Sequence, residues 1–180
     1  MEDPEVPTEH LQEHMQEHAA GSRGWIMQVA LAAAIFSALA AVASLKAGHS
    51  ANESMLAQIE SANQWAFFQS KSIKGSILRS KMDLMTALGK GTVEKDTAKL
   101  HEYENDLDQI KTKAEHLSEE SHALLHQHET LSHGVTLFQI CISISAMSVL
   151  VRSRKLWIVG LAFGAGGIVF LVKGLMFALN

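Results

Sequence analysis

The sequence predicts an all-α membrane protein with three transmembrane helices and a long antiparallel, coiled-coil-like helical hairpin between the first two. Three observations point to this fold. Apolar residues fill three blocks long enough to cross a bilayer, whose hydrocarbon core needs a helix of ~20 residues. The segment between the first two blocks carries apolar residues at heptad spacing. Both prolines, Pro4 and Pro7, lie at the start of the chain, so long uninterrupted helices can form in the rest of it.

Residues 1–24 form an acidic, histidine-rich segment ahead of the first span. The pair Glu-His recurs every four residues, which places His10, His14 and His18 on one side of a helix. Such a row could bind a metal ion or respond to pH. A helix of ~12 residues is marginal on its own. We therefore expect a solvated, weakly amphipathic helix at the membrane surface.

The three spans are expected at residues 25–45, 135–151 and 156–175. The first is long and follows an acidic flank, whereas a signal peptide has a basic flank and a shorter apolar region. The third contains Gly160, Gly164 and the pair Gly166-Gly167. Small residues at four-residue spacing let helices approach closely in lipid. We expect them to pack the three spans together, and contact between copies of the chain is the alternative.

A short basic turn at residues 152–155 predicts the orientation in the membrane. Arg152, Arg154 and Lys155 place positive charges between the second and third spans. Short basic loops stay in the cytoplasm. The N-terminal segment is then cytoplasmic, and the hairpin lies on the opposite side of the membrane. The inverted orientation is the alternative, because the hairpin carries many Lys and Arg residues of its own.

The hairpin is expected over residues 46–134, with its tip at residues 89–92. The tip, Gly89-Lys90-Gly91-Thr92, supplies a glycine that can end one helix and a threonine that can cap the next. The seam of the second arm is predicted at Val93, Asp96, Leu100, Tyr103, Leu107, Ile110, Ala114, Leu117, Ser121, Leu124, His128 and Leu131. The seam of the first arm is predicted at Leu56, Ile59, Asn63, Ala66, Ser70, Ile73, Ile77, Ser80, Leu84 and Ala87. Folding the chain about the tip then pairs Ala66 with Ala114.

An aromatic cluster on the first arm predicts a contact between copies of the chain. Relative to the predicted seam, Trp65 and Phe68 lie on the far face, and Phe67 lies on the flank. Large aromatic side chains gathered on a water-facing surface usually mark an interface. We therefore expect a homo-oligomer that uses this face. The alternative is that the hairpin itself, or lipid, covers the rings.

The root of the hairpin holds polar residues that could form a metal or proton site. The predicted register places His49 and Asn52 of the first arm near His128, with Glu129 and His133 close by. Imidazole and carboxylate groups bind transition metals, and imidazole also changes its charge near neutral pH. The competing interpretation is a hydrated polar junction where the two helices leave the bilayer.

Composition and motifs argue against an enzyme and against a nucleic-acid-binding protein. The net charge is −4, and Lys and Arg do not form the basic cluster that nucleic acid requires. The sequence contains no HExxH, CxxC, P-loop or GxSxG motif. Cys141 is the single cysteine, so no disulfide can form within the chain. We expect no catalytic residue and no cofactor.

Two strings, KAGHSANE at residues 46–53 and QWAFFQSKSIK at residues 64–74, are similar to a known family. The chain resembles the bacterial membrane proteins of domain-of-unknown-function family 4337. The resemblance covers nearly the whole chain, including the acidic N-terminus and the three-span layout. It implies a bacterial inner-membrane protein, whose hairpin would be periplasmic. It supplies no activity, substrate, cofactor or functional residue.

We therefore expect a non-enzymatic membrane scaffold whose hairpin acts in oligomerisation or docks a membrane or periplasmic partner protein. A metal- or pH-responsive membrane sensor is one alternative. A subunit of a small oligomeric channel or transporter is another, although the spans lack the polar stripes and paired charges that line a pore.

Overall fold

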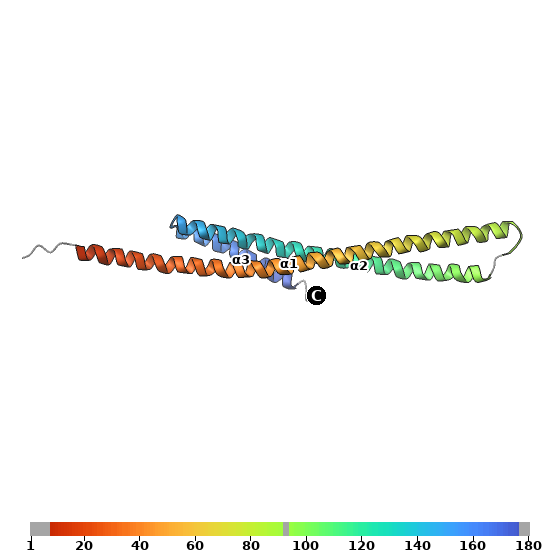
Figure 1. Cartoon of the computed structure of the whole chain (residues 1–180), viewed down its shortest axis with the longest axis horizontal. Helices are drawn as coiled ribbons and strands as arrows, with labels where there is room; N and C mark the ends of the chain where they lie inside the picture. Colours follow the sequence, from red (N-terminus) through yellow and green to blue (C-terminus); the bar gives the residue numbers. More distant parts are fainter. Residues whose placement is uncertain (1–7, 92–93, 177–180) are drawn as a thin grey trace, which may run out of the picture. The chain divides into compact units, whose positions relative to one another are not determined.

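The computed structural model describes residues 8–91 and 94–176, with their side chains from residue 24 onward. Within these ranges the chain forms three helices and no strand, which confirms the all-α class. They are α1 (Thr8–Ala87), α2 (Glu94–Leu150) and α3 (Arg154–Met176) (Figure 1). The side chains of the predicted histidine row, His10, His14 and His18, lie outside the described residues, as does Thr92 of the predicted tip.

The helices are long because nothing in their sequences interrupts them. Neither proline lies within a described helix, and Gly48, Gly75 and Gly134 are accommodated inside α1 or α2 without a break. Each of the three helices is long and apolar enough to cross a membrane. This agrees with the three predicted spans and is consistent with a multi-pass membrane protein.

Both α1 and α2 end through one residue in the left-handed backbone conformation. Gly89 follows α1 with φ at 69°, and the amide of Lys90 donates to the carbonyl oxygen of Met85 at 3.0 Å. Arg152 follows α2 with φ at 53°, and the amide of Ser153 donates to the carbonyl oxygen of Ser148 at 3.0 Å. These bonds satisfy carbonyl groups that a helix end otherwise leaves without partners.

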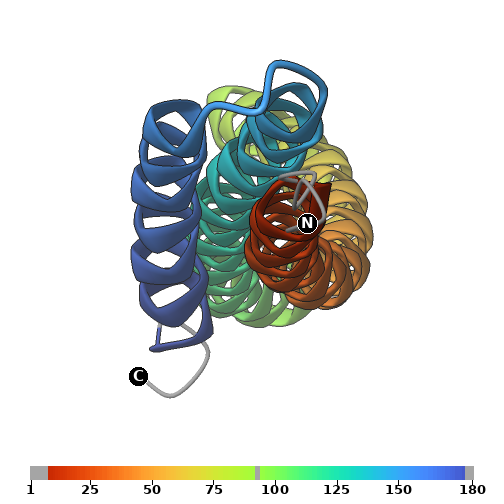
Figure 2. The ribbon, with the colours of Figure 1, turned by 90° about the vertical axis from the view of Figure 1, so that its left-hand side faces the viewer.

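The chain divides into two compact units. Residues up to Ala47 and from Glu129 onward form the first, which we name the three-helix unit, and Gly48–His128 form the second, which we name the two-helix unit. In the three-helix unit, α3 lies beside α2 (Figure 2). Its core consists of Ala40, Ala43, Ala47, Leu131, Phe138 and Leu171. The rings of Phe36 and Phe138 stack with their centroids 5.8 Å apart.

Glycines of α3 make close packing of this unit feasible. Gly160, Gly164, Gly167 and Gly174 are all buried. A Cβ atom at Gly167 would lie 2.7 Å from the ring of Phe138, and one at Gly174 would lie 2.6 Å from the side chain of Leu131. The predicted close packing of the three apolar helices through small residues is therefore confirmed for the glycines of α3.

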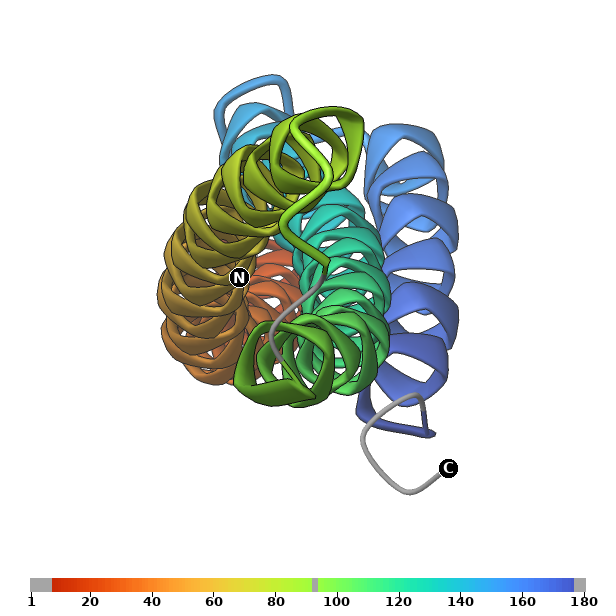
Figure 3. The ribbon, with the colours of Figure 1, turned by 90° about the vertical axis from the view of Figure 1, so that its right-hand side faces the viewer.

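In the two-helix unit, α1 and α2 lie side by side, with the turn after α1 in front in Figure 3. Hydrogen bonds and ion pairs join them along their length. Ser50 contacts Gln127, Ser61 contacts Ala114, and Lys81 contacts Asp96. Residue numbers therefore rise along α1 as those of their partners fall along α2.

The predicted seam of α2 is confirmed at its described positions from Asp96 to Leu131, and Val93 lies outside the described residues. The predicted seam of α1 is wrong. Ile110, Ala114 and Ser121 are buried as predicted. In α1, however, Leu56 is 67% exposed and Ile77 is 65% exposed. In the two-helix unit, a regular row of α1 positions is buried or half-buried: Ser50, Ser54, Ala57, Ser61, Gln64, Phe68, Lys71, Gly75, Leu78, Met82 and Met85. These positions also follow heptad spacing, but they lie on a different face of α1 from the predicted seam.

Candidate functional site

The contact between α1 and α2 is built on serine and alanine rather than on leucine and isoleucine. The Ser54 hydroxyl donates to the carbonyl oxygen of Ser121 at 2.8 Å, and the Ser121 hydroxyl donates to that of Ser54 at 2.9 Å. The Ser61 hydroxyl likewise donates to the carbonyl oxygen of Ala114 at 2.8 Å. A short side chain that bonds the facing backbone requires the two helices to lie close together. These hydrogen bonds offset the desolvation penalty that buried hydroxyls would otherwise impose on the packing.

These serines explain why the α1 seam was misassigned. Counting apolar side chains favours the row that contains more Leu and Ile. The regular spacing of Ser50, Ser54, Ala57 and Ser61 was the signal that could have identified the correct face. As a result, Ala114 faces Ser61 instead of the predicted Ala66.

The misassigned residues form an exposed surface on α1, which we name the outer row. It consists of Leu56, Ile59, Asn63, Ala66, Ser70, Ile73, Ile77, Ser80, Leu84 and Ala87, and all ten are exposed. Its five large aliphatic side chains are between 53% and 67% exposed. Single exposed apolar residues are ordinary, but a regular row of them along a helix typically marks an interaction surface.

The aromatic cluster is divided between the contact with α2 and the surface. Phe68 belongs to the observed row of α1 that packs against α2. Both Phe68 and Trp65 are half-buried, and their rings meet edge to face with centroids 5.5 Å apart. Phe67 is 48% exposed. The Lys71 ammonium lies 5.3 Å from the centre of the Phe67 ring and forms an ion pair with Asp106 of α2. The two-helix unit therefore partly covers two of the three rings, and the predicted interface at this cluster stays a prediction.

The predicted metal candidates are distributed over both units. His49, Asn52 and His128 belong to the two-helix unit, whereas Glu129 and His133 belong to the three-helix unit. Nε2 of His49 lies 3.1 Å from Oε1 of Glu53, one helical turn away. The ring of His133 packs edge-on against Phe170 with centroids 5.7 Å apart.

Among the residues with described side chains, no group of three or more His, Cys, Asp and Glu could hold a metal ion. The hypotheses of a metal site and of a proton site at the root of the hairpin stay predictions.

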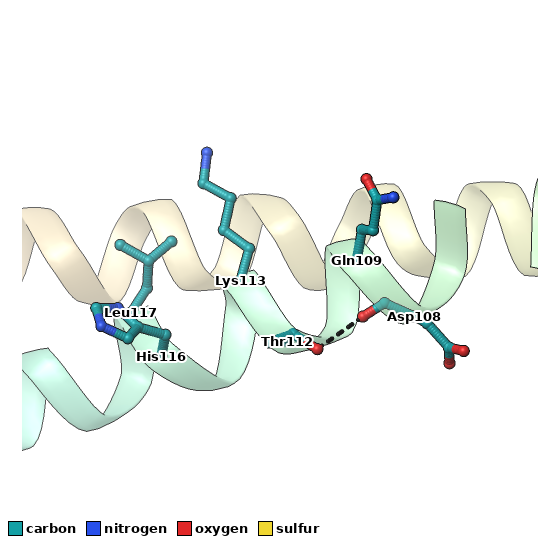
Figure 4. A pocket seen from close by; sticks show the side chains of 6 residues that line it. All are labelled: Asp108, Gln109, Thr112, Lys113, His116 and Leu117. Atoms are coloured by element: carbon teal, nitrogen blue, oxygen red, sulfur yellow. Dashed lines mark hydrogen bonds between the residues drawn. The ribbon is translucent and has the colours of Figure 1, made fainter. Parts of the chain in front are cut away.

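A hollow lies on the surface of α2, and all of its lining residues come from that helix. They are Asp108, Gln109, Thr112, Lys113, His116 and Leu117 (Figure 4). The Thr112 hydroxyl donates to the backbone carbonyl oxygen of Asp108 at 2.9 Å, within the same helix. The side chain of Asp108 points away from those of Gln109 and Lys113. An open hollow without convergent polar groups lacks the features of a small-molecule site.

The basic turn is positioned by the end of α2. Arg152 occupies the left-handed position of that turn, and α3 begins at Arg154, followed by Lys155. Arg152, Arg154 and Lys155 are all exposed. The three positive charges predicted to set the orientation in the membrane are thus available to solvent or to lipid headgroups.

Comparison with known proteins places the chain in a family. A family model described as "Domain of unknown function (DUF4337)" matches residues 25–177. This range includes the apolar part of α1, the outer row, all of α2 and all of α3. No curated protein and no solved structure matches the chain. Because the match covers most of the sequence, the chain belongs to the DUF4337 family.

Proposed function

We propose that the chain is a non-enzymatic, membrane-anchored scaffold whose two-helix unit is an antiparallel hairpin that docks a partner through its outer face. The observation that carries this proposal is the outer row. In a water-facing unit, a regular series of exposed Leu and Ile side chains is unfavourable unless another surface covers it.

The surfaces of the two units support their assignment to lipid and to water. In the three-helix unit, large apolar side chains point outward from every helix, among them Leu45, Leu150 and Val169 at 79%, 83% and 65% exposure. A bilayer accepts such a surface and water does not. The two-helix unit carries ion pairs between its helices, including Arg79 with Glu104 and Lys113 with Glu60. Charged pairs of this kind are costly in lipid and ordinary in water.

The basic turn supports a cytoplasmic N-terminus. Short loops rich in Lys and Arg remain on the cytoplasmic side, so the hairpin lies on the other side, which is the periplasm in a bacterial inner membrane. Arg152 strengthens this assignment. A non-glycine residue in the left-handed conformation costs about 1–2 kcal/mol, and glycine would avoid that cost. The presence of arginine there fits a requirement for its charge.

Cysteine labelling tests this orientation. In a Cys141→Ser background, Lys90→Cys lies at the turn after α1 and Ser153→Cys lies in the basic turn. The chain is produced in a Gram-negative host, and spheroplasts are treated with a membrane-impermeant maleimide. We expect Lys90→Cys to react in intact spheroplasts and Ser153→Cys to react only after lysis. If only Ser153→Cys reacted in intact spheroplasts, the protein would have the inverted orientation. Labelling of both variants before lysis would refute membrane spanning.

A further inference from the structure

The outer row has the geometry of a second coiled-coil seam on α1. Its ten positions run from Leu56 to Ala87 with alternating spacings of three and four residues, the spacing of a and d positions in a heptad. It lies on a different face of α1 from the seam with α2, because its members are exposed and the seam residues are not. At 1.5 Å per residue, the row extends for about 45 Å along the helix.

Heptad spacing identifies the kind of occupant. A row of a and d positions stays in line only against another α-helix that winds around it, because the period of 3.5 residues is that of knobs-into-holes packing. A flat surface or a short loop would not follow such a row over its whole length. The occupant is therefore a helix of comparable length with a matching pattern.

We propose that the outer row packs against the same row of a second copy of this chain, in parallel and in register. This inference rests on the proposed function, because it names the partner that the scaffold docks. Two chains anchored in one bilayer with the same orientation enter the water layer with their α1 helices running in the same direction. A parallel pair is the arrangement that this anchoring permits.

The polar positions of the row favour alignment in register. Asn63 and Ser70 occupy a-type positions and Ser80 a d-type position, and all three are exposed. In a parallel pair in register, each meets its own counterpart and can exchange hydrogen bonds with it, while Leu and Ile layers meet only each other. A single Asn at an a position is a known determinant of register in parallel coiled coils. An antiparallel pair centred on the row would instead set Ser70 against Ile73.

The flanks of the row are compatible with this pairing. One flank carries Glu60, Phe67, Lys74, Lys81 and Leu88, and the other carries Met55, Ala62, Gln69, Ser76 and Asp83. In a parallel pair, the first flank of one copy faces the second flank of the other, so no two like charges meet. An antiparallel pair would bring Glu60 near Lys81, but these side chains already pair within the chain with Lys113 and Asp96.

Disulfide cross-linking of the full chain in liposomes tests the proposal. Ile59→Cys and Leu84→Cys place a thiol near each end of the row, in a Cys141→Ser background. Both residues are more than half exposed, so the substitutions do not disturb the folded monomer. Gln58→Cys is the matched control, because it is exposed and adjacent to Ile59 but lies about 100° around the helix. Formation of covalent dimers under mild oxidation is followed by electrophoresis.

We expect Ile59→Cys and Leu84→Cys each to form a covalent dimer at least about tenfold faster than Gln58→Cys. A disulfide needs Cα atoms about 4.4–6.8 Å apart, which only the two facing rows provide. Two results would overturn the proposal. Cross-linking that occurs only when the Ile59→Cys and Leu84→Cys proteins are mixed would show an antiparallel pair. Equal or absent cross-linking of all variants would show that the row does not contact its copy, while the labelling test above would still decide membrane anchoring.

Discussion

Replacing Ala57 by leucine tests which face of α1 packs against α2. Ala57 is 8% exposed and lies between Ser54 and Ser61, whose hydroxyls reach backbone carbonyl oxygens of α2 at 2.8 Å. Helices held this close leave no space for three additional carbon atoms. Overpacking of this kind costs about 1–3 kcal/mol. Each 1.4 kcal/mol changes an equilibrium constant tenfold, so the equilibrium constant for local opening of the two-helix unit should rise about 5–150-fold.

Amide hydrogen exchange read by mass spectrometry measures this opening on the full chain in detergent micelles. Peptides from residues 94–128 should exchange faster in Ala57→Leu by that factor. Ala66→Leu is the matched control, with the same substitution on the same helix at a position that is exposed in the single chain. Both substitutions are made in an Ile73→Lys background, so that pairing through the outer row does not contribute. The effect of Ala66→Leu should stay within about 0.5 kcal/mol, which is roughly a twofold change in exchange. Faster exchange in Ala66→Leu with no change in Ala57→Leu would refute the observed register and restore the one based on apolar side chains.

Three further substitutions test the packing within each unit. Gly167→Ala should destabilise the three-helix unit by about 1–3 kcal/mol through overpacking. Gly166→Ala is the control and should not destabilise it, because its Cβ atom would meet its nearest neighbour at an ordinary 3.4 Å. Equal melting temperatures of the two variants in detergent would contradict this. Gly75→Ala should slow amide hydrogen exchange in the two-helix unit, because glycine destabilises a helix by about 0.5–1 kcal/mol relative to alanine and the added Cβ atom causes no clash. Faster exchange would show that the space around Gly75 is tighter than described. Asp106→Asn removes the partner of Lys71 and should cost up to about 1 kcal/mol, with a smaller effect at high salt; an effect independent of salt would argue against an ionic contribution.

The sequence was sufficient to predict the helices and their turns. Apolar blocks of bilayer length, the absence of proline after Pro7 and the glycines of the turn all act locally. The seam of α2 was also predictable, because Leu100, Ile110 and Leu117 mark its buried side by hydrophobicity alone. These features depend on the chain near each residue, which is the information that a sequence pattern contains.

The seam of α1 was not predicted because two faces of that helix carry heptad spacing. Hydrophobicity ranks the face with Leu56 and Ile77 above the face with Ser54 and Ser61. The outcome depends on α2, whose carbonyl oxygens at Ala114 and Ser121 accept the serine hydroxyls. The regular spacing of the serines indicates a candidate face, but whether their buried hydroxyls find hydrogen-bond partners is a property of the pair of helices. The consequence for function is large, since the face assigned to the interior became the candidate interface.

The mass of the full chain in lipid nanodiscs tests the central claim that the outer row joins two membrane-anchored copies. A single chain has a mass of 19.6 kDa. Native mass spectrometry should give twice that protein mass for the wild type. Ile73→Lys places a charge in the middle of the row at a position that is 60% exposed in the monomer, and it should return the mass to 19.6 kDa. A wild-type protein that remains at 19.6 kDa at every protein-to-lipid ratio would contradict the claim.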